Sequence, residues 1–128
     1  MNFTITRQNL HNGLAAVSAS IPSKTTLPVL SNILFEANDD GVWMSGTDLD
    51  VAVRVKVLAD VKEGGSLTAP GKKLQEITRE LPDQPVEVAT RGEQIELRCG
   101  RSHFKLNGLP ADEFPTLAEV DFSEGITV

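Results

Sequence analysis

The chain has 128 residues, of which 40% are hydrophobic and 23% are charged, and its formal net charge is −6. This length is typical of one domain, and the single cysteine, Cys99, excludes an internal disulfide bond. No apolar run approaches the roughly 20 residues that span a bilayer, so we expect a soluble, cytoplasmic protein.

The first half of the chain begins with a predicted strand, because apolar and polar residues alternate over residues 2–6. Thr6 is suited to cap a helix over residues 7–18. The apolar stripe of this helix consists of Leu10, Leu14, Val17 and Ile21. After a loop with two prolines, three strands are predicted at 33–37, 42–45 and 51–57. The third of these strands alternates valines with small or basic residues, which is typical of a half-buried antiparallel strand.

The second half repeats this order of elements without repeating the residues. A Glu-Gly-Gly turn at 63–65 leads to a short strand at 66–69. Pro70 then begins a helix that ends at Leu81, before Pro82. Further strands are predicted around 86–88, 95–97 and 104–106. The order strand, helix, three strands occurs twice, and it predicts an α+β fold of two units with antiparallel sheets and both helices on one side.

The acidic residues are unevenly distributed. Five of the 18 lie after Lys105, where no Lys or Arg occurs, so the rest of the chain is nearly neutral and can carry a basic face. We interpret residues 1–109 as one domain and residues 110–128 as a linker. The linker ends at 125–128 in a sequence that resembles residues 3–6, and we interpret this as the truncated first strand of a further copy.

Basic residues gather around the second predicted helix. Three lie on it and one lies in the loop after the first helix: Lys72, Lys73, Arg79 and Lys24. Bases on helices can contact phosphates without reading a nucleotide sequence. The alternative is a solvated helix face, which Glu76 and Glu80 on the same helix favour. The spacing alone does not decide between these interpretations.

A second basic group lies at the last predicted strand. Its members, with no acid between them, are Arg98, Arg101, His103 and Lys105. The last three share one face of the strand, and Phe104 and Leu106 lie on the other. Such a strand could be an edge that pairs with another chain, or its bases could protect the edge from aggregation. The pattern leaves both possibilities open.

No active site is indicated by the sequence. Asp48 and Asp50 lie in a predicted turn with no His or third carboxylate nearby in sequence, so turn chemistry explains them better than catalysis. His11 and His103 lack the spacing of zinc ligands, and Cys99 lacks a visible base partner. No Gly-rich phosphate loop occurs. We therefore expect no metal, no cofactor and no enzymatic activity.

Four stretches, in order along the chain, resemble one known family. They are Phe3-Thr4-Ile5; Thr26-Leu27-Pro28-Val29-Leu30 with Asn32; Gly46-Thr47-Asp48-Leu49; and Gly100-Arg101-Ser102 with Phe104, running into Leu109-Pro110-Ala111 and Phe114-Pro115. The chain is similar to the bacterial DNA polymerase III beta subunit, the sliding clamp. The resemblance implies the DNA-clamp fold, with three such domains in each protomer and two protomers joined head to tail in a ring lined by helices. This chain would be the first domain alone.

The resemblance also implies partners and site residues. The partners are duplex DNA, bound without sequence preference and only weakly by this piece, a second clamp protomer, and a polymerase and clamp loader that bind beyond residue 128. The implied DNA contacts are Lys24, Lys72 and Arg79. The implied subunit interface consists of Lys73, Arg101, His103, Phe104 and Leu106.

Two alternatives stand beside the clamp interpretation. The chain could be a small antiparallel domain that docks an acidic partner through its basic last strand. It could also be a hydrolase that uses Asp48 and Asp50. Two further copies of the strand-helix-three-strand pattern in a longer sequence would favour the clamp.

Overall fold

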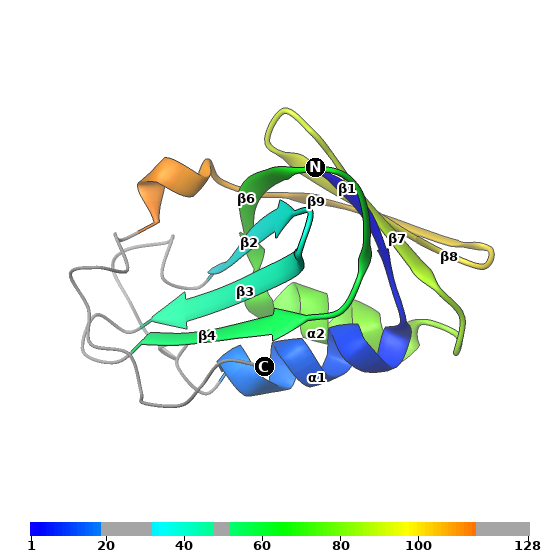
Figure 1. Cartoon of the computed structure of the whole chain (residues 1–128). Helices are drawn as coiled ribbons and strands as arrows, with labels where there is room; N and C mark the ends of the chain where they lie inside the picture. Colours follow the sequence, from blue (N-terminus) through cyan, green and yellow to red (C-terminus); the bar gives the residue numbers. More distant parts are fainter. Residues whose placement is uncertain (19–31, 48–51, 115–128) are drawn as a thin grey trace.

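The computed structural model describes residues 1–18, 32–47 and 52–114. Within these ranges, two α-helices and two antiparallel sheets form the predicted α+β fold (Figure 1). The strands are β1 (Asn2–Ile5), β2 (Asn32–Asn38), β3 (Gly41–Thr47), β4 (Ala52–Val57), β5 (Asp60–Glu63), β6 (Gly65–Pro70), β7 (Val86–Arg91), β8 (Gln94–Cys99) and β9 (Ser102–Asn107). The helices are α1 (Arg7–Ser18) and α2 (Gly71–Glu80), and a short 3₁₀ turn, η2, follows at Ala111–Glu113.

Helix α1 has the predicted bounds. It begins at Arg7, and the Thr6 hydroxyl caps it by accepting a hydrogen bond from the backbone N–H of Asn9 at 3.1 Å. Its predicted apolar stripe is buried at Leu10, Leu14 and Val17. The fourth stripe residue, Ile21, lies outside the described residues. Neither helix in the described ranges is long and apolar enough to cross a membrane.

A glycine in the middle of α1 is explained by the close approach of this helix to the sheet. A Cβ atom at Gly13 would lie 2.6 Å from Met44 Sδ and 3.0 Å from Val57 Cγ1. Glycine costs about 1 kcal/mol relative to alanine inside a helix. In the packing of α1 against β3 and β4, an alanine at this position would require the buried Met44 side chain to shift.

The two halves of the chain exchange their first strands. The sheet orders are β5-β1-β7-β8-β9 and β4-β3-β2-β6, and all pairs are antiparallel. β1 comes from the first half but pairs with β7 of the second. β6 comes from the second half but pairs with β2 of the first. The repeated pattern predicts the two units but not this exchange, through which both halves build one core.

Strand β5 is an element that the sequence pattern does not indicate. We expected a turn at 63–65, and the structure has a strand over Asp60–Glu63 immediately before Gly64. Val61 is the only apolar residue of this strand, and most of its side chains are exposed. β5 is the edge strand of its sheet and pairs with β1. Backbone hydrogen bonding therefore defines this strand, and its sequence shows no apolar periodicity that would predict it.

The hydrophobic core lies between the sheets and the helices. In Figure 1, α1 and α2 lie side by side on one side of the strands, as predicted. Fully buried side chains come from both helices and both sheets, among them Phe3, Leu10, Leu14, Phe35, Met44, Leu74, Ile95 and Leu97. Because both helices bury their apolar sides in this core, their polar sides face outward together.

Residues just after β9 connect the two sheets. The backbones of Thr68 and Leu109 exchange two hydrogen bonds, of 3.0 and 3.1 Å, and the Thr68 hydroxyl donates a third to the Leu109 carbonyl at 3.0 Å. Asn32 Nδ2 donates to the same hydroxyl at 3.0 Å. The turn η2 follows, and Phe114 is buried. The proposed domain division after residue 109 remains a prediction.

Candidate functional site

Helix α2 exposes three of the predicted bases. Leu74 is buried, whereas Lys72, Lys73 and Arg79 are exposed, and none of the three forms an ion pair with another described residue. With 3.6 residues per turn, Lys72 and Arg79 are nearly in line along the helix and about 10 Å apart, and Lys73 lies about 100° around the axis. Glu76 is exposed on the same side as the aligned pair. Lys72 and Arg79 can therefore contact neighbouring groups of one polyanion, with Glu76 beside them and Glu80 exposed further around the helix.

The neighbouring helix adds a surface with little charge. Helix α1 contains no acidic residue, and its exposed side chains are Gln8, His11, Asn12, Ala15 and Ala16. Arg7 Nε donates a hydrogen bond to the Thr78 carbonyl at 3.1 Å, which joins the start of α1 to the last turn of α2. Lys24, the fourth predicted base, lies outside the described residues.

Strand β9 forms one edge of the five-stranded sheet. It pairs with β8, and no strand in the described part of the chain pairs with its other side. Phe104 and Leu106 are half-buried and pack against the core, whereas His103 and Lys105 are exposed on the outer face. Arg101 is exposed in the turn that precedes the strand. The structure thus gathers the predicted interface residues of this strand along one open edge.

Glu96 is a site residue that the sequence analysis missed. It lies on β8 directly opposite Lys105 and is 7% exposed, although it is on the outer face of the sheet. Its carboxylate lies 3.6 Å from His103 Nε2, 3.8 Å from Arg98 Nη2 and 4.0 Å from Lys105 Nζ. Along the chain, no acid lies between Arg98 and Lys105. The pairing of β8 with β9 nevertheless places the acid Glu96 beside His103 and Lys105. That register is not visible in the residue pattern.

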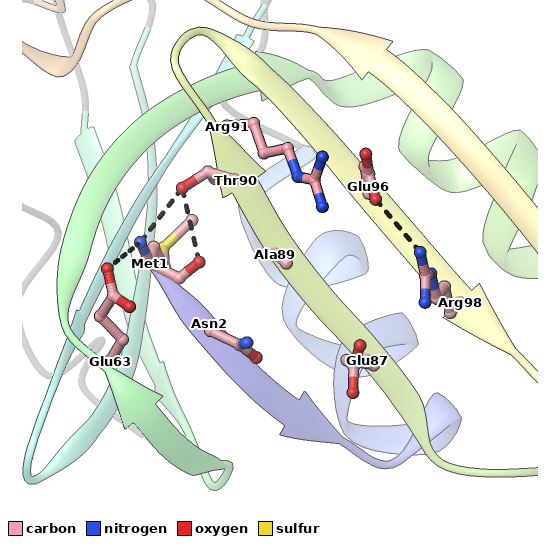
Figure 2. Close-up of a pocket in the computed structure, with 9 residues that line it drawn as sticks. All are labelled: Met1, Asn2, Glu63, Glu87, Ala89, Thr90, Arg91, Glu96 and Arg98. Atoms are coloured by element: carbon pink, nitrogen blue, oxygen red, sulfur yellow. Dashed lines mark hydrogen bonds and ion pairs between the residues drawn. The ribbon is translucent and has the colours of Figure 1, made fainter.

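A shallow depression of about 250 Å³ lies beside Glu96 on the outer face of the same sheet (Figure 2). Its middle lies over Ala89, which is in register with Asn2 on one side and Glu96 on the other. Figure 2 shows Arg91 and Arg98 on the same face, with a dashed line that joins Arg98 to Glu96. Acids and bases both line the depression, so it does not favour an ion of either sign.

Three kinds of catalytic or metal-binding group were considered from the sequence: clusters of metal ligands, Cys99, and the pair Asp48 and Asp50. The described residues include no group of three or more His, Cys, Asp and Glu side chains that could hold a metal ion. Cys99 is buried, and its Sγ lies 3.4 Å from the carbonyl oxygens of Pro82 and Gln84, so it packs as a core residue. Asp48 and Asp50 lie outside the described residues.

Comparison with known families identifies the family to which this fold belongs. The family described as DNA polymerase III beta subunit, N-terminal domain, matches residues 1–118. The chain belongs to this family. The beta sliding clamp of Vibrio harveyi is 38% identical over 121 residues, which cover 93% of this chain and 83% of that sequence. The beta sliding clamp of Escherichia coli K12 is 37% identical over an alignment of 129 residues that includes 96% of this chain and 35% of that sequence.

Solved sliding-clamp structures confirm the predicted fold. A DNA polymerase sliding clamp from Caulobacter crescentus superposes with a TM-score of 0.87 at 37% identity, over 98% of this chain and 34% of that one. The DNA polymerase III subunit beta from Pseudomonas aeruginosa gives 0.83 at 39% identity, over 91% and 32%. The chain likewise spans only 32% and 33% of the length of two curated relatives from Streptomyces.

Proposed function

We propose that this chain is the first domain of a sliding clamp, the non-catalytic processivity factor of a replicative DNA polymerase in the cytoplasm. The observation that carries the proposal is the joint match in sequence and fold to the N-terminal domain of the DNA polymerase III beta subunit. In the ring, the proposed partners are duplex DNA and a second protomer. A polymerase and a clamp loader would bind through domains beyond residue 128.

The helix pair suits a surface along which DNA can slide. Lys72 and Arg79 would contact phosphates, with Lys24 as a further proposed contact. Phosphate contacts carry no base-sequence information, so the free energy of the complex changes little as the duplex moves. The acid-free, sparsely charged surface of α1 would add little attraction and little repulsion. The ring would hold the duplex by encircling it, and tight binding would oppose sliding.

The free edge of β9 suits the proposed contact between protomers. A partner strand at this edge would extend the five-stranded sheet, with Phe104 and Leu106 as apolar contacts. Arg101 and His103, with Lys73 of α2, would face acids of the partner. The same open edge also supports the alternative function, a small domain that docks an acidic protein and never surrounds DNA.

The isolated chain is expected to bind a short DNA duplex only weakly, with a dissociation constant of about 10⁻⁴ M or higher at physiological salt. Lys72→Glu is expected to weaken this binding further and to lower the salt dependence by about one unit of slope, because one phosphate contact is lost. Fluorescence anisotropy with a labelled duplex measures both quantities. Lys62→Glu, which makes the same charge change on the exposed strand β5, is the matched control and should have little effect. Tight, salt-insensitive binding would contradict the proposal.

A topological experiment separates the clamp from the acidic-partner alternative. After loading by its clamp loader, the full-length protein that contains this domain should remain on a closed circular plasmid during gel filtration. It should be lost once the plasmid is cut to a linear form, because a ring can slide off an end. A domain that only docks a protein would show no difference between the circular and linear plasmids.

A further inference from the structure

The basic edge of the five-stranded sheet contains its own acid. The side chain of Glu96 is 9% exposed, whereas those of Arg98, His103 and Lys105 are 57%, 41% and 55% exposed. The separations of 3.6–4.0 Å exceed the 3.5 Å limit of a hydrogen bond. The contacts of Arg98 and Lys105 with Glu96 are therefore ion pairs without hydrogen bonds. Together with His103, these side chains cover the carboxylate.

Two of these bases, His103 and Lys105, lie on β9 itself, beside the position that an added strand would take. Alternate residues of a strand point to opposite faces, so His103 and Lys105 share the outer face and Phe104 and Leu106 share the other. A complementary strand would alternate acidic and apolar residues. A second copy of β9 would place bases opposite bases, which is unfavourable. Charge complementarity therefore favours an acidic strand as the occupant.

We propose that Glu96 is a built-in competitor for the acids of the strand that pairs with β9. This inference rests on the proposed use of β9 as the contact between protomers. In the free chain, Glu96 neutralises part of the positive charge of Arg98 and Lys105, and its carboxylate lies 3.6 Å from His103 Nε2. An arriving acidic strand would share these bases with Glu96 and would be repelled by its carboxylate. Arg101 forms no ion pair within the described part of the chain and remains fully available.

The consequence is a contact weaker than its bases alone would give. Like charges close to one interface disfavour association, so Glu96 lowers the affinity without changing the shape of the edge. A ring held in this way would open at a lower free-energy cost than one with an unopposed basic edge. In Figure 2, Glu96 and Arg98 lie on the same strand, joined by a dashed line.

The inference can be tested on the 128-residue chain with a labelled peptide of alternating glutamate and valine. Glu96→Gln is expected to tighten binding of the peptide about three- to tenfold at low salt, because one like charge is removed from the contact. The difference should shrink as salt screens the charges. Glu96→Leu removes the same charge with an apolar side chain and should also tighten binding. Fluorescence anisotropy gives the affinities, and thermal melting confirms that each variant is folded.

Glu87→Gln is the matched control. Glu87 lines the same depression from β7, carries the same charge, and forms no ion pair with another described residue. The Glu87→Gln substitution should leave the affinity for the peptide unchanged. Methylating alternate backbone amides of the peptide should abolish binding, because an added strand needs those N–H groups.

Three results would overturn the inference. They are equal affinity of the parent and both Glu96 variants, equal tightening by Glu87→Gln, and no binding of the peptide by any variant. Retention on circular but not linear plasmid is measured independently of the peptide. The proposed clamp function can therefore stand if this inference fails.

Discussion

Leu106→Ala is expected to shift the proposed dimer of the full-length protein toward monomer while it destabilises the isolated domain only slightly. Leu106 is half-buried on the open edge strand β9. Truncating a side chain of this burial removes about 1 kcal/mol from the folding free energy. If a partner strand covers Leu106, the dimer dissociation constant should also rise about tenfold or more. Analytical ultracentrifugation of the full-length protein and thermal melting of this chain measure the two effects separately.

The residue opposite Leu106 provides the control. Ile95 pairs with it in register but is fully buried, so Ile95→Ala should cost the isolated chain about 2–5 kcal/mol. An unchanged dimer together with a strongly destabilised Leu106→Ala domain would assign Leu106 to the core and remove it from the interface.

The polar half of the proposed contact, Arg101 and His103, should make the dimer dissociate more readily as salt is added.

Gly108→Ala is expected to lower the stability of the isolated chain by about 3 kcal/mol, and the melting temperature by roughly 10 °C. A Cβ atom at Gly108 would overlap the backbone carbonyl oxygen of Thr68, and it would also lie 3.2 Å from the Glu93 carbonyl oxygen. Neither backbone group can rotate away as a side chain can. The overlap would displace the paired hydrogen bonds between Thr68 and Leu109 that join the two sheets. Differential scanning calorimetry measures the loss.

Gly92→Ala separates this steric effect from the general effect of replacing a glycine. Gly92 has a φ of +59°, but a Cβ atom there would have nothing within 4 Å. Its replacement should cost about 1–2 kcal/mol through backbone strain alone. Equal destabilisation by Gly92→Ala and Gly108→Ala would show that the approach to Thr68 is not as close as the structure indicates.

The elements that could be predicted from the sequence are those whose signal lies within one segment. The spacing of Leu10, Leu14 and Val17 predicts α1, and Pro82 predicts the end of α2 to within one residue. The alternation around Phe104 predicts a strand with bases on one face and apolar residues on the other; His103 and Lys105 lie on that strand, whereas Arg101 lies in the turn before it. The exposure of Lys72 follows from helical periodicity in the same way. Each of these signals depends on residues only a few positions apart.

The tertiary structure alone decided which segments meet. The exchange of β1 and β6 between the two halves depends on pairing across the chain, and so does the pairing that makes β5 a strand. Gly13 looks unfavourable within its helix until Met44 is placed against it. Glu96 has Arg98 two residues along its own strand, and only the register of β8 and β9 adds His103 and Lys105 beside it. Local periodicity determines which face of an element is apolar, whereas register and packing between distant segments determine which side chains come into contact.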